Sequence, residues 1–339
     1  MKFSIGYPLN PVSGSSFFER MSPLLGHIAE LYFAWPGAPS ARSAAGSDFG
    51  IIDYGAPDEL LDELAAFRSA GVKLALLFNG NCYGEDSMSY ALECRVCSVL
   101  AYMARTVGLP ETVTAASPAI AFVVKKHFPS IKTRASVNMR IGTVEGLDYM
   151  SDRFDEFILQ RDYNRDIERI RELTDWCSAN GKAASILVNS GCLRFCSGQT
   201  FHDNLVAHGE GADMRYPIED FSLYTCWNYL ARSTENLLSL LRATWIRPED
   251  LHHYDPYFDT VKLATRMHPS PYMVLEAYVS RRFTGNLLDL FEPGFGSLLE
   301  PRIVDNNKFS PDWFEKALAC DKKCTRCGVC RAEWERIFT

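Results

Sequence analysis

Short apolar runs, rich in β-branched and aromatic residues, alternate along the chain with longer segments in which apolar residues recur at helical spacing. Helical patterns of this kind cover Pro57–Ala70, Ser87–Val107, Pro118–His127 and Asn164–Asn180. The short runs with the length and composition of strands are Lys2–Tyr7, Glu30–Ala34, Val72–Asn79, Thr112–Ala115, Lys132–Asn138, Glu156–Gln160, Ala184–Asn189 and Thr260–Ala264. Eight such alternations predict an α/β protein with a (β/α)8, TIM-like barrel. An open, doubly wound sheet is the alternative, but no strand is followed by a Gly-x-Gly-x-x-Gly loop, which disfavours a dinucleotide site.

Two stretches depart from this rhythm. Roughly seventy residues separate the strand ending at Asn189 from the one beginning at Thr260, far more than a usual loop–helix–loop connection. We therefore expect an insertion at about residues 197–255, over one rim of the barrel. The tail from Asn306 onward carries a dense group of cysteines, so we expect a barrel domain at residues 1–305 and a cysteine-rich extension at residues 306–339.

The composition is that of a globular protein, with 47% hydrophobic and 23% charged residues in 339. The 42 acidic and 35 basic side chains leave a net charge of -7, which excludes a general nucleic-acid coat but allows a local basic patch. No stretch reaches the ~18 apolar residues of a membrane helix, and the first residues lack the apolar core of a signal peptide. Eleven cysteines then indicate a reducing, cytoplasmic location, where thiols serve metals or chemistry rather than disulfides.

The most specific local signal is a run of four cysteines within eleven residues, at Cys320, Cys324, Cys327 and Cys330. Lys and Arg side chains between them keep the segment solvated, so packing does not explain the thiols, and bare thiols there would oxidise. Close-set cysteines two residues apart are typical of ferredoxin-type iron–sulfur sites, whereas zinc sites usually divide their cysteines into two distant pairs. We therefore favour an iron–sulfur cluster in the tail, with a structural zinc site and free thiols as the alternatives.

A second group of cysteines follows the apolar run at residues 186–188. Cys192 and Cys196 emerge at the carboxyl end of a strand, which is the end that carries the active site of a barrel. Cys82 stands three residues after the end of an earlier strand, as Cys192 does after its own, and Cys226 lies further along. These four thiols are expected to converge on one rim and to hold a cluster there. Burial as ordinary packing residues is the alternative, above all for Cys82 and Cys226.

Charged residues also follow the strands. Arg161, Asp162 and Arg165 come after the strand at residues 156–160, and Lys262 and Arg266 lie at the end of the last strand. Arginines that grip a carboxylate or phosphate by paired hydrogen bonds would suit a small anionic substrate.

Two of these positions have a plainer interpretation. Asp162 or Asn164 is also suited to capping the next helix, and capping is the favoured role for Asn164. His202, just behind the cysteine pair, is a candidate proton donor, with a structural role as the alternative. No His-Glu-x-x-His or Gly-x-Ser-x-Gly motif is present, so a protease would need another nucleophile.

The chain resembles the collagenase-like U-32 peptidase family. The resemblance covers roughly residues 130–290 and rests on five segments in fixed order, namely 136–138, 161–165, 187–196 with His202, 245–251 and 261–266. It implies a barrel-type fold with an oxygen-sensitive 4Fe-4S cluster held by four cysteines. The family motif carries over to Cys192 and Cys196, and the four-cysteine tail is not part of the family's common core.

The resemblance also bears on function. Despite the peptidase name, several members act in oxygen-independent hydroxylation, of the ubiquinone ring or of RNA pyrimidines, with prephenate implicated for some. The leading hypothesis is therefore an iron–sulfur oxidoreductase that modifies a small anionic substrate, with RNA less favoured as the substrate. A peptidase is one alternative. The other is a non-catalytic electron-transfer or scaffold subunit that works with a related partner subunit or a redox donor.

Overall fold

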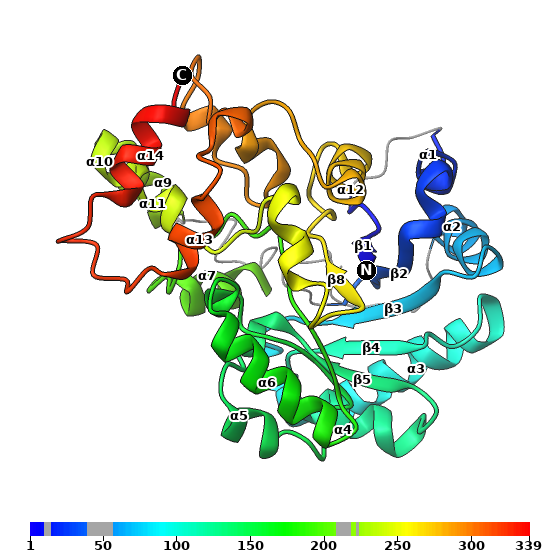
Figure 1. Ribbon diagram of the computed structural model, residues 1–339. Helices are drawn as coiled ribbons and strands as arrows, with labels where there is room; N and C mark the ends of the chain where they lie inside the picture. The colour runs from blue at the N-terminus through cyan, green and yellow to red at the C-terminus, as the bar shows by residue number, and fades with distance from the viewer. Residues whose placement is uncertain (10–14, 39–56, 208–217, 222–223) are drawn as a thin grey trace.

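A computed structural model describes residues 1–9, 15–38, 57–207, 218–221 and 224–339 (Figure 1). In this part of the chain, eight strands form one parallel sheet in the order β7-β6-β5-β4-β3-β2-β1-β8. The strands are β1 (Lys2–Gly6), β2 (Ile28–Ala34), β3 (Lys73–Phe78), β4 (Thr112–Ala115), β5 (Lys132–Ala135), β6 (Glu156–Ile158), β7 (Ala183–Ser185) and β8 (Thr260–Lys262). Each lies within or overlaps a run that the sequence predicts to be a strand.

The two edges of the sheet meet just beyond β7. Leu187 pairs with Lys262 in a parallel bridge. The N–H of Lys262 donates to the carbonyl of Ile186 at 2.9 Å, and the N–H of Val188 donates to the carbonyl of Lys262 at 3.1 Å. These bonds close the sheet into a barrel, which confirms the predicted (β/α)8, TIM-like class.

Some strands end earlier than the apolar pattern suggests. β5 ends at Ala135 because the chain then turns into a short 3-10 helix, η3 (Val137–Met139). The hydroxyl of Ser136 accepts a hydrogen bond from the N–H of Asn138 at 3.3 Å and so stabilises this turn. As a result, Asn138 lies at the carboxyl rim of the barrel rather than inside a strand.

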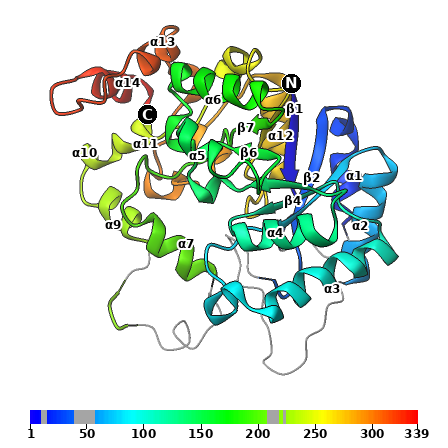
Figure 2. The same cartoon turned by 90° about the horizontal axis from the view of Figure 1, so that it is seen from below.

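Helices cover the outside of the barrel (Figure 2). They are α1 (Phe17–Met21), α2 (Asp58–Ser69), α3 (Tyr90–Thr106), α4 (Pro118–His127), α5 (Val144–Asp148), α6 (Ile167–Ala179) and α12 (Pro271–Ser280). Asp166 is the N-cap of α6, and its carboxylate accepts the N–H of Arg169 at 3.1 Å. The prediction that Asn164 caps this helix was wrong, since its side chain instead donates to the carbonyl of Leu187 at 2.7 Å and joins β6 to β7.

A buried ionic layer fills the interior of the barrel. Arg134 on β5 donates to both carboxylate oxygens of Glu30 on β2, at 2.7 and 2.8 Å, and its Nε donates to Glu156 on β6 at 2.8 Å. Ser4 on β1 adds a hydrogen bond to Glu30 at 2.7 Å. Burial raises the pKa of Glu30, but Arg134 outweighs burial and holds the pKa below its usual range. This pairing is what allows charged groups to lie inside the barrel.

Further helices gather beyond the carboxyl ends of the strands. Those between β7 and β8 are α7 (Gln199–Ala207), α9 (Thr225–Ala231), α10 (Thr234–Leu237) and α11 (Ser239–Arg242), and those near the carboxyl terminus are α13 (Trp313–Leu318) and α14 (Val329–Ile337). α14 lies beside α11, although the two are far apart in the sequence (Figure 1). The last residue, Thr339, exchanges backbone hydrogen bonds with Ile303 at 2.8 and 3.1 Å, so the tail is tied to the segment that precedes residue 306. No helix in the described ranges is both long and apolar enough to cross a membrane.

Candidate functional site

A cavity of about 1040 Å³ opens at the carboxyl rim of β5 to β8. Three thiols line it, those of Cys192 and Cys196 after β7 and that of Cys226 on α9. Arg161 and His202 line the same space. We call this space the barrel-mouth cavity. Its position is the one at which barrels place their chemistry.

Asn189 and Gly191 fix the start of the cysteine loop. The fully buried amide of Asn189 donates to the carbonyls of Ala264 and Leu290, at 2.9 and 3.0 Å, and accepts the N–H of Ala264 at 2.6 Å. A Cβ on Gly191 would stand 2.1 Å from the carbonyl oxygen of Pro293, so only glycine permits this approach. The backbone therefore leaves β7 along a defined path before it reaches Cys192.

Asp162 holds the end of the same loop. Its Oδ1 accepts the N–H of Phe195 at 2.5 Å, and its backbone carbonyl accepts the Nε of Arg194 at 3.1 Å. The other carboxylate oxygen accepts the amide of Gln160 at 3.1 Å. Phe195 has a φ of 47°, which is uncommon for a side chain of this size and needs such support. Asp162 is thus a positioning residue for Cys196 and does not line the cavity itself.

The three thiols lie close enough to affect one another. Burial raises the pKa of Cys226, and the neighbouring Cys192 and Cys196 raise it further. Thiolates repel each other in this way unless a positive centre lies between them. The donor set therefore suits a thiolate-bound metal, and its chemistry matches that of iron–sulfur sites.

The fourth predicted ligand is not brought to this group. Cys82 follows β3, where its sulfur accepts the N–H of Gly84 at 3.4 Å, and among the described residues it is not part of the cavity lining. Within the same residues, no three His, Cys, Asp or Glu side chains stand where they could hold a single metal ion. The ligands of a four-iron cluster lie further apart than the ligands of a single ion, so this finding does not test a cluster site. That Cys82 is a ligand of a cluster at the barrel mouth remains a prediction.

Arg161 has an exceptional setting. Its side chain is 7% exposed and lines the cavity, and no hydrogen bond or ion pair joins it to another residue in the part of the chain that the structure describes. A buried guanidinium without a carboxylate partner favours an anionic ligand. His202, by contrast, packs edge-to-face on Tyr224, with ring centroids 5.5 Å apart.

Three other predicted cationic residues lie elsewhere. Arg165 points away from the barrel mouth, where its guanidinium donates to the carbonyls of Leu241 and Trp245. Lys262 lies inside the barrel, with its Nζ 3.8 Å from the centroid of the Tyr32 ring. The expectation that these residues surround one mouth together with Arg161 is not met in the described structure.

Arg266 is the third of these residues. Its Cγ would be 2.5 Å from a Cβ placed on Gly6, so it packs against β1 beside Tyr32 and does not line the barrel-mouth cavity.

Burial also changes the chemistry of Lys262. It lowers the pKa of the ammonium group to about 7, with Arg134 and Arg266 lowering it and Glu30 and Glu292 raising it. The group is therefore part of the buried ionic layer of the barrel. Apart from the charged residues within predicted strands, no sequence pattern indicates this layer.

Residues that the sequence did not single out form much of the cavity wall. The segment at 286–303 supplies Asp289, Glu292 and Glu300, and α7 supplies Asp203. Asp203 is paired with Arg140 at 3.0 Å, and Glu292 accepts the N–H of Met267 at 3.2 Å. No motif marks this segment, and its place follows only from the backbone bonds that join it to residues 189–191.

The barrel and its cysteine-lined mouth define this chain as an α/β-barrel protein with a candidate thiolate site. No family model matches the chain. An uncharacterized protease of Methanocaldococcus jannaschii, MJ1657, is 29% identical over 182 residues, which are 53% of this chain and 52% of that protein. The chain thus spans about half the length of the curated relative it matches.

A solved structure with a TM-score above 0.5 supports the barrel fold. The U32 peptidase Mk0906 has a TM-score of 0.53 and 14% identity, and the match covers 78% of this chain and 92% of that one. A putative racemase from Roseobacter denitrificans has a TM-score of 0.38 at 14% identity, over 59% of this chain and 50% of that one. The chain is therefore similar in sequence to an uncharacterized protease and in fold to a U32 peptidase.

Proposed function

We propose that this chain is an iron–sulfur enzyme of the U32 family that carries out a redox modification, of the oxygen-independent hydroxylation type, on a small anionic substrate. One observation carries the proposal: Cys192, Cys196 and Cys226 line the same cavity as Arg161, a buried residue whose guanidinium has no ion pair among the described residues. The cavity thus combines a thiolate donor set with a place for an anionic group.

Cys192, Cys196 and Cys226 would hold the cluster, with Cys82 as the predicted fourth ligand. When bound, a 4Fe-4S cluster supplies one-electron redox chemistry or a Lewis-acidic iron. The protein's own residues would bind the substrate, transfer protons and exclude water. Arg161 would bind a carboxylate or phosphate by paired hydrogen bonds, His202 would hold or deliver a proton, and the apolar wall would exclude water.

The charge of the lining limits the substrate further. Four carboxylates and two arginines face the barrel-mouth cavity. A polyanion such as RNA would meet repulsion from most of this wall, whereas a compound with a single anionic group need only reach Arg161. The proposal is therefore a small carboxylate or phosphate compound with an otherwise neutral body.

Peptide hydrolysis is the second candidate, because the M. jannaschii relative is named a protease and the structural neighbour a peptidase. In that case one of the three cavity thiols would serve as a nucleophile, and it would have to be free of metal.

Anaerobic purification followed by iron, sulfide and zinc analysis tests the proposal. Iron and sulfide in the wild type, at a lower content in Cys192→Ser and Cys226→Ser but at an unchanged content in Cys94→Ser, would support it. Cys94 lies on α3 and lines neither cavity described in this structure. An iron-free protein that hydrolyses peptides and is inactivated by thiol alkylation would overturn it. Turnover by the isolated chain would also exclude a purely accessory subunit.

A further inference from the structure

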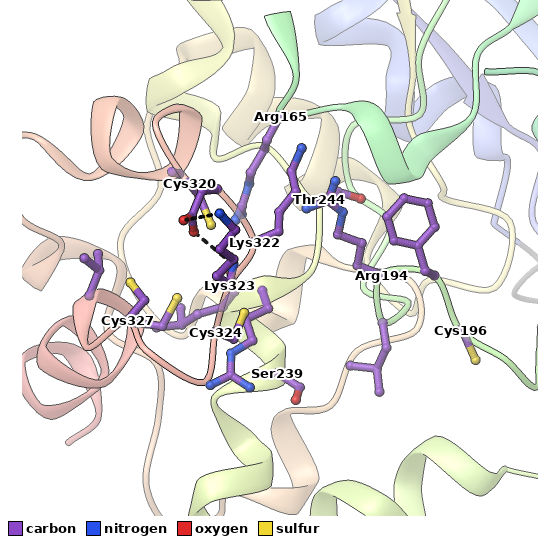
Figure 3. Close-up of a pocket in the computed structure, with 18 of the residues that line it drawn as sticks. Arg165, Arg194, Cys196, Ser239, Thr244, Cys320, Lys322, Lys323, Cys324 and Cys327 are labelled. Carbon is purple, nitrogen blue, oxygen red and sulfur yellow. Dashed lines mark hydrogen bonds and ion pairs between the residues drawn. The ribbon is translucent and has the colours of Figure 1, made fainter. Parts of the chain in front are cut away.

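A second cavity, of about 1310 Å³, lies between the tail and the helices of the insertion (Figure 3). All four cysteines of the segment at 320–330 line it, together with residues of α9, α11 and α13. We call it the tail cavity. The sequence motif is therefore not an isolated tail, because its thiols line a space whose other walls come from distant parts of the chain.

The charge of the tail cavity is opposite to that of the whole protein. Eight of its lining side chains are Lys or Arg and one, Asp321, is a carboxylate, although acidic residues exceed basic ones in the chain. Such a wall is suited to an anionic occupant. An iron–sulfur cluster held by four thiolates is one, since the thiolates outweigh the net positive charge of the iron–sulfide core.

Arg165 is the most informative of these cations. It lies beyond the end of β6, and its half-buried side chain donates hydrogen bonds of 2.7 to 3.0 Å to the carbonyls of Leu241 and Trp245. It lies 4.1 Å from the centroid of the Trp245 ring, so its orientation is fixed by stacking as well as by hydrogen bonds. In the close-up, Arg165 points from above toward the loop that carries Cys320 and Cys324. The barrel thus contributes a fixed positive charge to the tail cysteines.

The spacing of the cysteines selects the kind of metal site. Cys324, Cys327 and Cys330 are separated from one another by two residues, as in ferredoxin-type runs, and Cys320 adds a fourth thiol that three residues separate from Cys324. Cys320, Cys324 and Cys327 lie on the connection between α13 and α14, and Cys330 lies in the first turn of α14. Cys327 is exposed, whereas Cys330 packs against the core.

The two cavities share a wall. Leu193, Cys196 and Cys226 line both of them, so two of the barrel-mouth thiols belong to the wall that the two cavities share. We propose that Cys320, Cys324, Cys327 and Cys330 hold an iron–sulfur cluster of their own in the tail cavity, separate from the barrel-mouth site and next to it. This site does not depend on the proposed function of the barrel mouth.

The test compares two double variants, Cys324→Ser/Cys327→Ser in the tail and Cys192→Ser/Cys196→Ser at the barrel mouth, with Cys94→Ser as the control. All are full-length, purified without oxygen and assayed for iron, sulfide and zinc. We expect about eight irons in the wild type and the control and about four in each double variant. After reduction with dithionite, the electron paramagnetic resonance signal of the wild type should be broadened by two neighbouring spins, and each double variant should give a narrow signal.

Full iron content in the tail variant, or zinc alone bound by the tail, would overturn this inference and leave the barrel proposal standing. Full iron content in the barrel variant would overturn the barrel proposal and leave this inference standing. Cys327→Ser alone is the reserve variant if the double variant does not fold, because the side chain is exposed and its replacement disturbs no packing. It should still lower the iron content relative to the control.

Discussion

The carboxylate of Asp162 accepts the backbone N–H of Phe195 at 2.5 Å, so a residue after β6 holds the loop that carries Cys192 and Cys196. This single bond joins two neighbouring strand ends at the place where the thiols enter the cavity. The structural role of Asp162, which lies next to Arg161 but does not line the cavity, is therefore to hold this loop.

Asp162→Ala should lower the free energy of unfolding by about 1–3 kcal/mol, because it leaves the N–H of Phe195 without its buried partner. It should also reduce the iron bound at the barrel mouth. Urea unfolding and iron analysis measure the two effects. The control is Asp152→Asn, whose carboxylate is exposed and forms only a surface ion pair with Arg153. Equal stability and iron content in both variants would show that Asp162 does not position the loop.

Gly191→Ala should be far more disruptive than its size suggests. The added Cβ would lie 2.1 Å from the carbonyl oxygen of Pro293, so the backbone must move and the hydrogen bonds joining residues 189–191 to Glu292 must weaken. We expect a loss of about 2 kcal/mol or more in urea unfolding. Gly26→Ala is the matched control, since a Cβ there meets no atom within 4 Å. A Gly191→Ala protein as stable as this control would show that the backbone at Pro293 can move to make room for the Cβ.

The strands and helices could be predicted from the sequence because the spacing of apolar residues reflects which face of each element is buried. All eight strands and the helices α2, α3, α4 and α6 lie where the pattern places them. The segment at 286–303 was not predicted as part of the cavity, since its position depends on long-range bonds such as that of the Asn189 amide to the carbonyl of Leu290. Periodicity carries no information about such contacts.

The candidate site was predicted unevenly for the same reason. Position after a strand correctly places Cys192, Cys196 and Arg161 at the barrel mouth. It does not tell which way a long side chain turns. Arg165 follows the same strand as Arg161 but bends outward, where the Trp245 ring and two carbonyls bind its guanidinium. Lys262 ends its strand facing inward, toward Tyr32.

The buried Lys262 predicts a specific pH dependence. Its pKa is about 7 in the folded chain and 10.5 when unperturbed, so between these values the unfolded state binds more protons than the folded state. The free energy of unfolding contributed by this group therefore rises with pH from about 7 to about 10. Urea unfolding at several pH values should show this rise as an increase with pH in the free energy of unfolding of the wild type minus that of Lys262→Met. Lys132→Met, at an exposed position, should show no such rise, and an equal slope in both variants would contradict the prediction.

The last prediction concerns the substrate and rests on Arg161. A small carboxylate or phosphate compound, phosphoglycolate or phenylpyruvate for example, should raise the melting temperature, because it pairs with a buried guanidinium that has no ion pair among the described residues. Arg161→Ala should remove this shift and keep the fold, whereas Arg105→Ala, on the exposed face of α3, should keep both. Differential scanning fluorimetry with and without ligand measures the shift. Tight, salt-sensitive binding of tRNA that survives Arg161→Ala would contradict the prediction. RNA would then contact a basic surface such as the tail cavity wall, and the barrel mouth would not be its recognition site.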